Sequence, residues 1–139
     1  MKRIIILLGI MFASIYSFAG TPPEAVKKTF MDKYPGVAKV SWGKENATEW
    51  EAEFTFKGEK LSANFKEDGT WVETEHKITF EQLPKAVAEV LKKSYADWKI
   101  VEVDKTETAK NGLIYEADLK KGKEKKTAAY KEDGTVVME

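Results

Sequence analysis

The chain has 139 residues, a formal net charge of zero and no cysteine. Balanced charge gives no electrostatic reason to expect binding to nucleic acid or to an anionic membrane, and without cysteine the fold must be held by packing. The length suits one compact domain, and a second independent core is not expected.

The first 19 residues have the three regions of a secretory signal peptide. Met1-Lys2-Arg3 supplies the charged start, residues 4–12 form an apolar run, and Ser17-Phe18-Ala19 resembles a cleavage site. The alternative is an uncleaved membrane anchor, for which the apolar run is short. No arginine follows the segment, which disfavours dedicated phosphate recognition. We therefore expect an exported protein, periplasmic or secreted, with residues 1–19 as the signal peptide.

A helix is expected to begin soon after the cleavage site. Thr21 and Glu24 fit a capping box, in which each side chain satisfies a free backbone amide of the other. Apolar residues then recur on one face at Val26, Phe30 and Tyr34. The Pro-Gly pair that follows ends the predicted helix.

The residues after this helix change to a period of two, which predicts strands. In residues 49–57 the apolar side chains alternate with acidic and polar ones, as in a strand with one buried face. Short Gly-containing segments separate this strand from its neighbours. The expected antiparallel strands are residues 37–42, 49–57, 61–65 and 71–74.

The sequence of residues 66–70, Lys-Glu-Asp-Gly-Thr, returns letter for letter at residues 131–135. A second helix, from Pro84 to Tyr95, matches the first. We therefore predict an α+β fold made by tandem duplication, with repeats 21–76 and 80–139 in one domain, 20–139. Each repeat is a helix plus a four-stranded antiparallel sheet, with the helices on one face. We expect the repeats to share one core and the Asp-Gly pairs to supply positive φ angles in tight turns.

No catalytic constellation is present. His76 is the only histidine, and we expect it to be exposed between the repeats; with Glu73 and Glu75 alone it is a poor set of metal ligands. The acidic residues of 49–53 could serve as an acid–base pair, but they fit a solvated strand face better. We expect no enzymatic activity, no metal site and no cofactor.

Two tryptophans are the expected contact residues, Trp71 and Trp98. Their counterparts in the other repeat are Val136 and Val37, and a position that accepts either size often lies at a rim. With helices on one face of the sheet, the other face is left for a partner. We expect Trp71 near the rim of that face.

The paired helices, the Trp50-Glu51-Ala52 and Tyr115-Glu116-Ala117 strands and the repeated Glu-Asp-Gly-Thr turns resemble the PepSY-like family of exported bacterial domains, whose fold is similar to that of β-lactamase inhibitor proteins. The resemblance covers nearly all of residues 21–139 and rests on structural motifs, including the helix exit Tyr34-Pro35-Gly36. It implies a family that binds or restrains other proteins such as peptidases. The resemblance does not assign a functional residue of the family to any position of this sequence.

Two hypotheses of function follow. The first is an exported, non-enzymatic module that binds or inhibits another exported or periplasmic protein, of the peptidase-regulating type, through the open sheet face. The alternative is a periplasmic small-ligand or cation-binding protein, which would need a concave pocket with converging polar groups. We expect neither a nucleic-acid partner nor, after removal of the signal peptide, a membrane. The sequence leaves the oligomeric state open.

The signal peptide gives a first prediction. Intact-mass analysis of the protein from its native envelope fraction should show a chain that starts at Gly20, because export would remove residues 1–19. A membrane-bound species that retains Met1 would contradict this.

Overall fold

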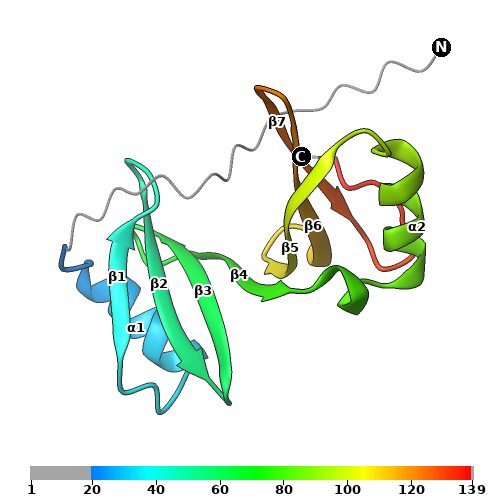
Figure 1. Cartoon of the computed structure of the whole chain (residues 1–139). Coiled ribbons are helices and arrows are strands. Elements are labelled where there is room, and N and C mark those ends of the chain that lie inside the picture. The colour runs from blue at the N-terminus through cyan, green and yellow to red at the C-terminus, as the bar shows by residue number, and fades with distance from the viewer. Residues whose placement is uncertain (1–19, 139) are drawn as a thin grey trace. The chain divides into compact units, whose positions relative to one another are not determined.

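The computed structural model describes residues 20–138, which form two helices, a 3-10 helix and seven strands. The predicted signal peptide lies outside these residues. Figure 1 shows the elements, and the strands follow one another in the order β1 to β7. Their bounds are α1 Glu24–Lys33, β1 Val40–Lys44, β2 Glu49–Phe56, β3 Glu59–Lys66, β4 Trp71–Ile78, η1 Phe80–Gln82, α2 Lys85–Ser94, β5 Lys99–Thr108, β6 Gly112–Lys121 and β7 Glu124–Tyr130.

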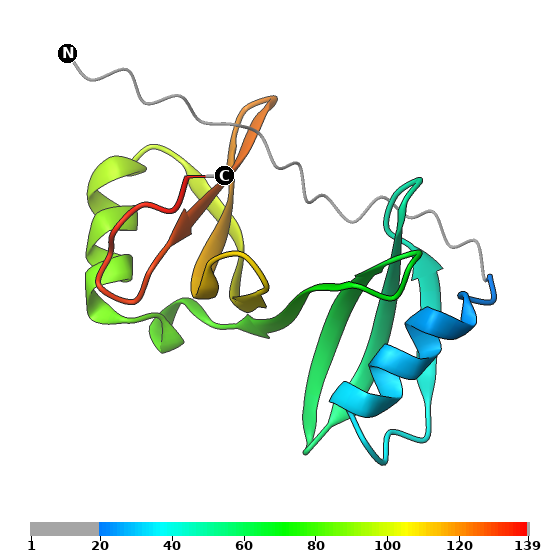
Figure 2. The ribbon, with the colours of Figure 1, turned by 180° about the vertical axis from the view of Figure 1, so that it is seen from behind.

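The described residues divide into two compact units. The N-terminal unit comprises residues 20–77 and 106–112, and the C-terminal unit comprises residues 78–105 and 113–138. Each unit contains one α-helix, which covers one face of its own strands. In the N-terminal unit, α1 lies behind β1–β3 in Figure 1 and in front of them in Figure 2, so Figure 1 shows the helix-free face of these strands.

Helix α1 begins later than expected. Its N-cap is Pro23, which makes no side-chain capping bond, and the Pro23 carbonyl accepts hydrogen bonds from the amides of Val26 and Lys27. The predicted capping box of Thr21 and Glu24 is therefore wrong: Glu24 is the first helical residue, so the two side chains do not occupy the N-cap and N3 positions that the box requires.

The two helices end in the same way. The amide of Tyr34 donates to the Phe30 carbonyl over 2.8 Å, and the amide of Tyr95 donates to the Leu91 carbonyl over 2.9 Å. The predicted apolar stripe of the first helix is confirmed, since Val26, Phe30 and Tyr34 are all buried.

Strand β2 confirms the predicted alternation: its buried residues, Trp50, Ala52 and Phe54, pack with α1 in one cluster. Strand β1 begins at Val40 rather than residue 37, and β4 continues to Ile78, past the expected end at residue 74.

The C-terminal unit differs from the prediction of four strands. Strands β6 and β7 pair from Tyr115↔Tyr130 to Lys121↔Glu124, but only an isolated bridge, Tyr130↔Val136, stands where a fourth strand was expected. The chain turns at Gly134 against Ala86 of α2, and the pairing that follows consists of this bridge and a hydrogen bond from the Val137 amide. The prediction of two four-stranded units is therefore not confirmed.

Apart from Ile114 of β6, the buried apolar side chains form two clusters, one against each helix. The expectation that the repeats share one core stays a prediction. The cluster at α1 includes Phe30 and Phe65, and the cluster at α2 includes Leu91 and Leu119. Each helix buries its own stripe against the inward residues of the strands that follow it.

The repeated Asp-Gly turns confirm the predicted positive φ angles, at +89° for Gly69 and +82° for Gly134. In each turn the aspartate side chain accepts a hydrogen bond from the amide two residues later, over 2.8 Å from Thr70 and 2.9 Å from Thr135. Both turns also touch a helix. A Cβ added to Gly69 would lie 2.7 Å from the carbonyl oxygen of Ala25.

The close approach of Gly69 to α1 allows two effects of replacing glycine to be measured separately: the strain of a positive φ and a clash with the helix backbone. Gly69→Ala should destabilise the protein by about 2 kcal/mol or more, because it adds a backbone clash to the strain of a positive φ. The matched control is Gly58→Ala, at φ +86° with nothing within 4 Å of the added Cβ, which should cost only about 1 kcal/mol. Urea unfolding measures both, and equal losses would contradict the role of the helix contact.

Candidate functional site

Trp71 does not lie at the rim of the helix-free face. It pairs with Phe65, a core residue, and its indole Nε1 donates to Thr74 Oγ1 over 2.9 Å. Thr74 Oγ1 in turn hydrogen-bonds the Tyr34 hydroxyl, and Lys33 Nζ lies 3.8 Å from the centroid of the Trp71 ring. Trp71 therefore packs on the helix side, at the end of α1.

The physical reason is a β-bulge. Asn64 pairs with Glu73, but the next residue of β3 pairs with Trp71, so the register shifts and Val72 is the extra residue. Regular alternation from the inward Thr74 would turn Trp71 outward; one inserted residue reverses its face.

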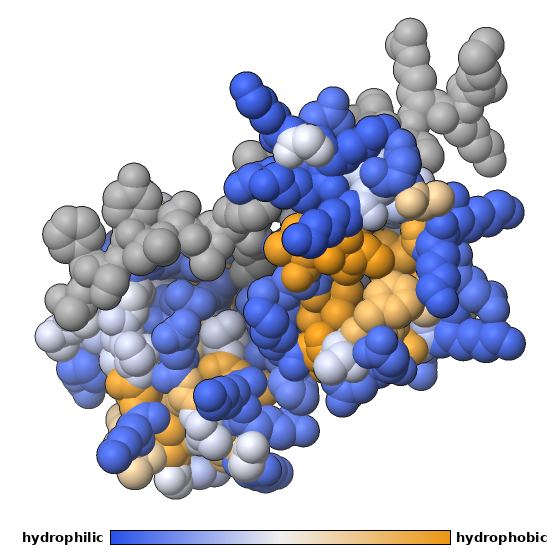
Figure 3. All heavy atoms as spheres, in the orientation of Figure 1, coloured by the Kyte–Doolittle hydropathy of each residue, from blue (hydrophilic) through white to orange (hydrophobic). Residues whose placement is uncertain are grey.

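Trp98 lies in the turn between α2 and β5, partly buried against the C-terminal cluster. Its ring is edge-on to Tyr95 at 6.1 Å between centroids, and Lys126 Nζ lies 4.3 Å from its centroid. In Figure 3 apolar side chains gather in one area over the C-terminal unit, bordered by hydrophilic ones.

Trp71 and Trp98 are both held by contacts within the protein. Their role as contact residues for a partner stays a prediction.

His76 lies inside β4, not between the repeats, and its side chain is 31% exposed. Its Nδ1 lies 3.8 Å from Glu59 Oε2. Alternation along β4 places His76 on the opposite face from Glu73 and Glu75, so the three residues do not form one site. Within residues 20–138 no three acidic or histidine side chains are gathered closely enough to hold a metal ion.

The pairing of β2, β3 and β4 brings together a set of residues that the sequence shows only in pieces. Two rows cross these strands, and in each a polar side chain of β3 is flanked by one glutamate from each neighbour. We call them the carboxylate rows: Glu51–Asn64–Glu73 and Glu53–Ser62–Glu75.

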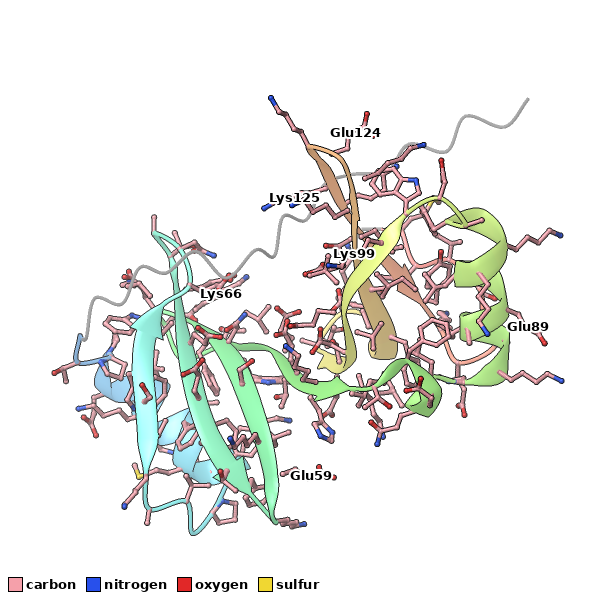
Figure 4. All side chains as sticks on the ribbon, viewed as in Figure 1. Glu59, Lys66, Glu89, Lys99, Glu124 and Lys125 are labelled. Atoms are coloured by element: carbon pink, nitrogen blue, oxygen red, sulfur yellow. The ribbon has the colours of Figure 1, made fainter. Side chains whose placement is uncertain are left out.

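The carboxylate rows lie on the face of the strands away from α1, because their residues alternate with the buried ones. Figure 4 labels Glu59 and Lys66 at the two ends of β3, between which the central residues of both rows lie. The rows continue onto β1 at Gly43 and Ser41, both of which are small. Nothing larger than a serine therefore stands beside the rows on this strand.

Asn64 is the most buried member of the rows, at 3% exposure. Its Nδ2 donates to Glu73 Oε1 over 3.2 Å, while its Oδ1 is buried without a hydrogen-bond partner. A buried acceptor left unpaired costs about 1–3 kcal/mol. In the second row Ser62 Oγ donates to Glu75 Oε2 over 3.3 Å.

The first row also holds a carboxyl group with a shifted pKa. Burial, and then the carboxylates of Glu45 and Glu53, raise the pKa of Glu51 to about 7. Burial and the charge of Glu49 likewise raise the pKa of Glu45 above its usual range. Like charges held at low solvation attract cations, so this end of the face favours a positively charged group.

Sequence reasoning identified both acidic segments but did not join them. The acids of 49–53 were recognised as one strand face, and Glu73 and Glu75 were weighed only with His76. Asn64 was missed, since an asparagine in a strand carries no signal of its own. A search for acids at alternate positions on neighbouring antiparallel strands could have found the rows.

The N-terminal unit also has a hollow on its surface. The hollow, of about 640 Å³, lies beside the end of α1, lined by Asp32, Lys33, Pro35, Gly36, Val37, Thr55, Phe56 and Lys57. It contains no member of the carboxylate rows. None of the helices in residues 20–138 is long and apolar enough to span a membrane.

The shifted pKa of Glu51 predicts a pH-dependent effect on stability. The folded protein holds the proton of the Glu51 carboxyl group more tightly than the unfolded chain does. The stability that this proton contributes is therefore fully present below pH 4.5 and is lost as the pH rises through about 7. Glu51→Gln should leave stability nearly unchanged at pH 4 and raise it by about 1 kcal/mol at pH 8, after discounting for solvent screening.

The control for this prediction is Glu132→Gln, at an exposed position of the second Asp-Gly turn. It should give the same small change at both pH values in urea unfolding. A Glu51→Gln protein that is less stable at pH 8 would contradict the shifted pKa.

Comparison with known proteins agrees with the fold. Residues 48–136 match the family described as "Putative beta-lactamase-inhibitor-like, PepSY-like". No protein among those with curated descriptions matches the sequence.

Solved structures from Bacteroides species are similar in fold. A DUF2874 family protein from Bacteroides ovatus is 24% identical, with a TM-score of 0.71 over 86% of both chains. A structure described as "putative periplasmic proteins" from Bacteroides eggerthii is 21% identical, with a TM-score of 0.70 over 86% of this chain and 88% of that one. A BLIP-like protein from Bacteroides fragilis is 20% identical, with a TM-score of 0.70 over 86% of this chain and 85% of that one.

The family match spans more than half of the sequence and includes β2 to β7, the strands that carry both the repeated Asp-Gly turns and the carboxylate rows. The structural neighbours independently support the same arrangement of helices and strands. This chain belongs to the PepSY-like, β-lactamase-inhibitor-like family.

Proposed function

We propose that this protein is an exported, non-enzymatic binding module that contacts another exported protein through the helix-free face of β2–β4. The observation that carries the proposal is the pair of carboxylate rows. A face built from paired acids and polar side chains has a defined charge pattern, and such patterns give a partner its orientation and specificity.

Export is supported by the signal-like start of the sequence and by the neighbour from Bacteroides eggerthii that is described as periplasmic. A role without catalysis is supported by the family description, which is inhibitor-like. The inhibitory form of the hypothesis, restraint of a peptidase or related enzyme, rests on this description and on the BLIP-like neighbour.

The alternative, a small-ligand or cation-binding protein, has weaker support. It needs a pocket with converging polar groups, and the hollow at the end of α1 draws much of its lining from a Pro-Gly turn and from Val37 and Phe56. Its acidic residue, Asp32, already pairs with Lys28 at 2.7 Å.

The proposal is tested by capture of partners from the native envelope fraction. Glu53→Gln combined with Glu75→Gln removes two charges from the second row and should reduce capture at least tenfold, which corresponds to about 1.4 kcal/mol. The melting temperature should change little, because Glu53 is exposed and a glutamine in place of the half-buried Glu75 keeps an oxygen that can accept from Ser62.

The matched control combines Glu24→Gln and Glu89→Gln, which remove the same charge from the two helices. It should leave capture unchanged. Equal loss in both proteins would show a general charge effect and contradict a site on the strand face. Trp71→Ala and Trp98→Ala belong in the same experiment, since loss of capture without a fall in melting temperature would identify either residue as a direct contact.

A further inference from the structure

The buried oxygen of Asn64 points to the chemistry of the group that the first carboxylate row receives. This Oδ1 is an acceptor without a partner, at the centre of a row whose two ends are carboxylates. Asn64 cannot turn its amide to supply a donor there without giving up the bond from Nδ2 to Glu73. The missing partner must therefore bring N–H or O–H donors.

A lysine ammonium group meets this requirement. It carries three N–H donors and one positive charge, and the row offers acceptors from three residues, Glu51, Asn64 and Glu73. Neighbouring residues across antiparallel strands have Cβ atoms about 5 Å apart, so the long glutamate side chains on either side can reach a group held above Asn64. The positive charge also offsets the repulsion among Glu51, Glu45 and Glu53.

The two rows together indicate the form of the partner. Glu51 and Glu53 are two residues apart on β2, as are Ser62 and Asn64 on β3 and Glu73 and Glu75 on β4. The rows are therefore about 6.8 Å apart along the strands, which is also the distance between alternate side chains of an extended peptide. Gly43 and Ser41 of β1 are small, so no large side chain stands beside the rows on the β1 side.

We propose that the carboxylate rows bind an extended, lysine-bearing segment of a partner protein, in which two lysines at alternating positions each place one ammonium group over one row. One ammonium group lies over Asn64 between Glu51 and Glu73, and the other lies over Ser62 between Glu53 and Glu75. The inference rests on the proposed function, because it names the chemistry of the same face.

The test uses the purified protein and three synthetic peptides of equal length. Two have the same composition, one with its lysines at alternate positions and one with its lysines adjacent; the third is the alternate-lysine peptide with its lysines acetylated. Calorimetry at low salt should show the alternate-lysine peptide binding at least fivefold more tightly than the adjacent-lysine peptide. The acetylated peptide should not bind. In NMR spectra the alternate-lysine peptide should shift the side-chain amide signals of Asn64.

The variants locate the site. Glu51→Gln and Glu73→Gln should each weaken binding of the alternate-lysine peptide at least fivefold, and Asn64→Leu, which removes the acceptor, should do so while Asn64→Asp does not. If Asn64→Leu fails to fold, the two glutamine variants carry the test. The combined Glu24→Gln and Glu89→Gln protein should bind within twofold of the unaltered protein.

Four results would overturn the proposal. If the three peptides bound equally, or if the row variants bound the alternate-lysine peptide as tightly as the unaltered protein does, a lysine-specific site would be ruled out. Binding of 1,5-diaminopentane as tightly as the alternate-lysine peptide would assign the rows to a small amine. Self-association in sedimentation that is lost in the row variants would make a second copy the occupant, through the lysine-rich hairpin whose tip is marked by Glu124 and Lys125 in Figure 4.

The inference and the proposed function can fail separately. If envelope capture depended on the second row but the lysine peptides did not bind, the strand face would remain the proposed binding site and its specificity for lysine would be rejected. Loss of both the row-dependent capture and the peptide binding would reject the face as a site.

Discussion

The packing of the Phe30 ring against three strands is the interaction on which the fold of the N-terminal unit depends. Its centroid lies 4.8 Å from that of Phe54, 5.2 Å from that of Trp42 and 6.3 Å from that of Phe65. These rings come from three successive strands, so one helical side chain fixes the inward face of all three. Each aromatic pair adds about 0.5–1.5 kcal/mol beyond the area that it buries.

The same contact determines the opposite face. A strand whose alternate residues are held against α1 must direct the residues between them away from it. Once Ala52 faces Ala63 in the core, Glu51 must lie across from Asn64 on the other side. The carboxylate rows are therefore a consequence of core packing, and a one-residue slip of β3 would break the rows and the core together.

Local deviations from regular structure decide which residues take part in each face. The bulge at Val72 brings Trp71 into the network of Thr74 and Tyr34, where its indole has a hydrogen-bond partner. The extension of β4 to Ile78 places His76 on a strand, beside Glu59 rather than beside the neighbouring acids. The result is a helix side rich in aromatic rings and a helix-free side rich in carboxylates.

The residue pattern of the chain was enough to predict the class of fold, both helices, the alternation in β2 and the positive φ angles of the Asp-Gly turns, and it carries the resemblance to the PepSY-like family. These features depend on residues close together in the chain: the period of apolar residues, the Pro-Gly exit and the special freedom of glycine. The folded chain was needed to find the pairing of Glu51, Asn64 and Glu73, the side on which Trp71 lies, and the two clusters of buried apolar side chains. Each of these depends on strand register or on a single inserted residue, and register is set by contacts between distant segments, which local periodicity does not contain.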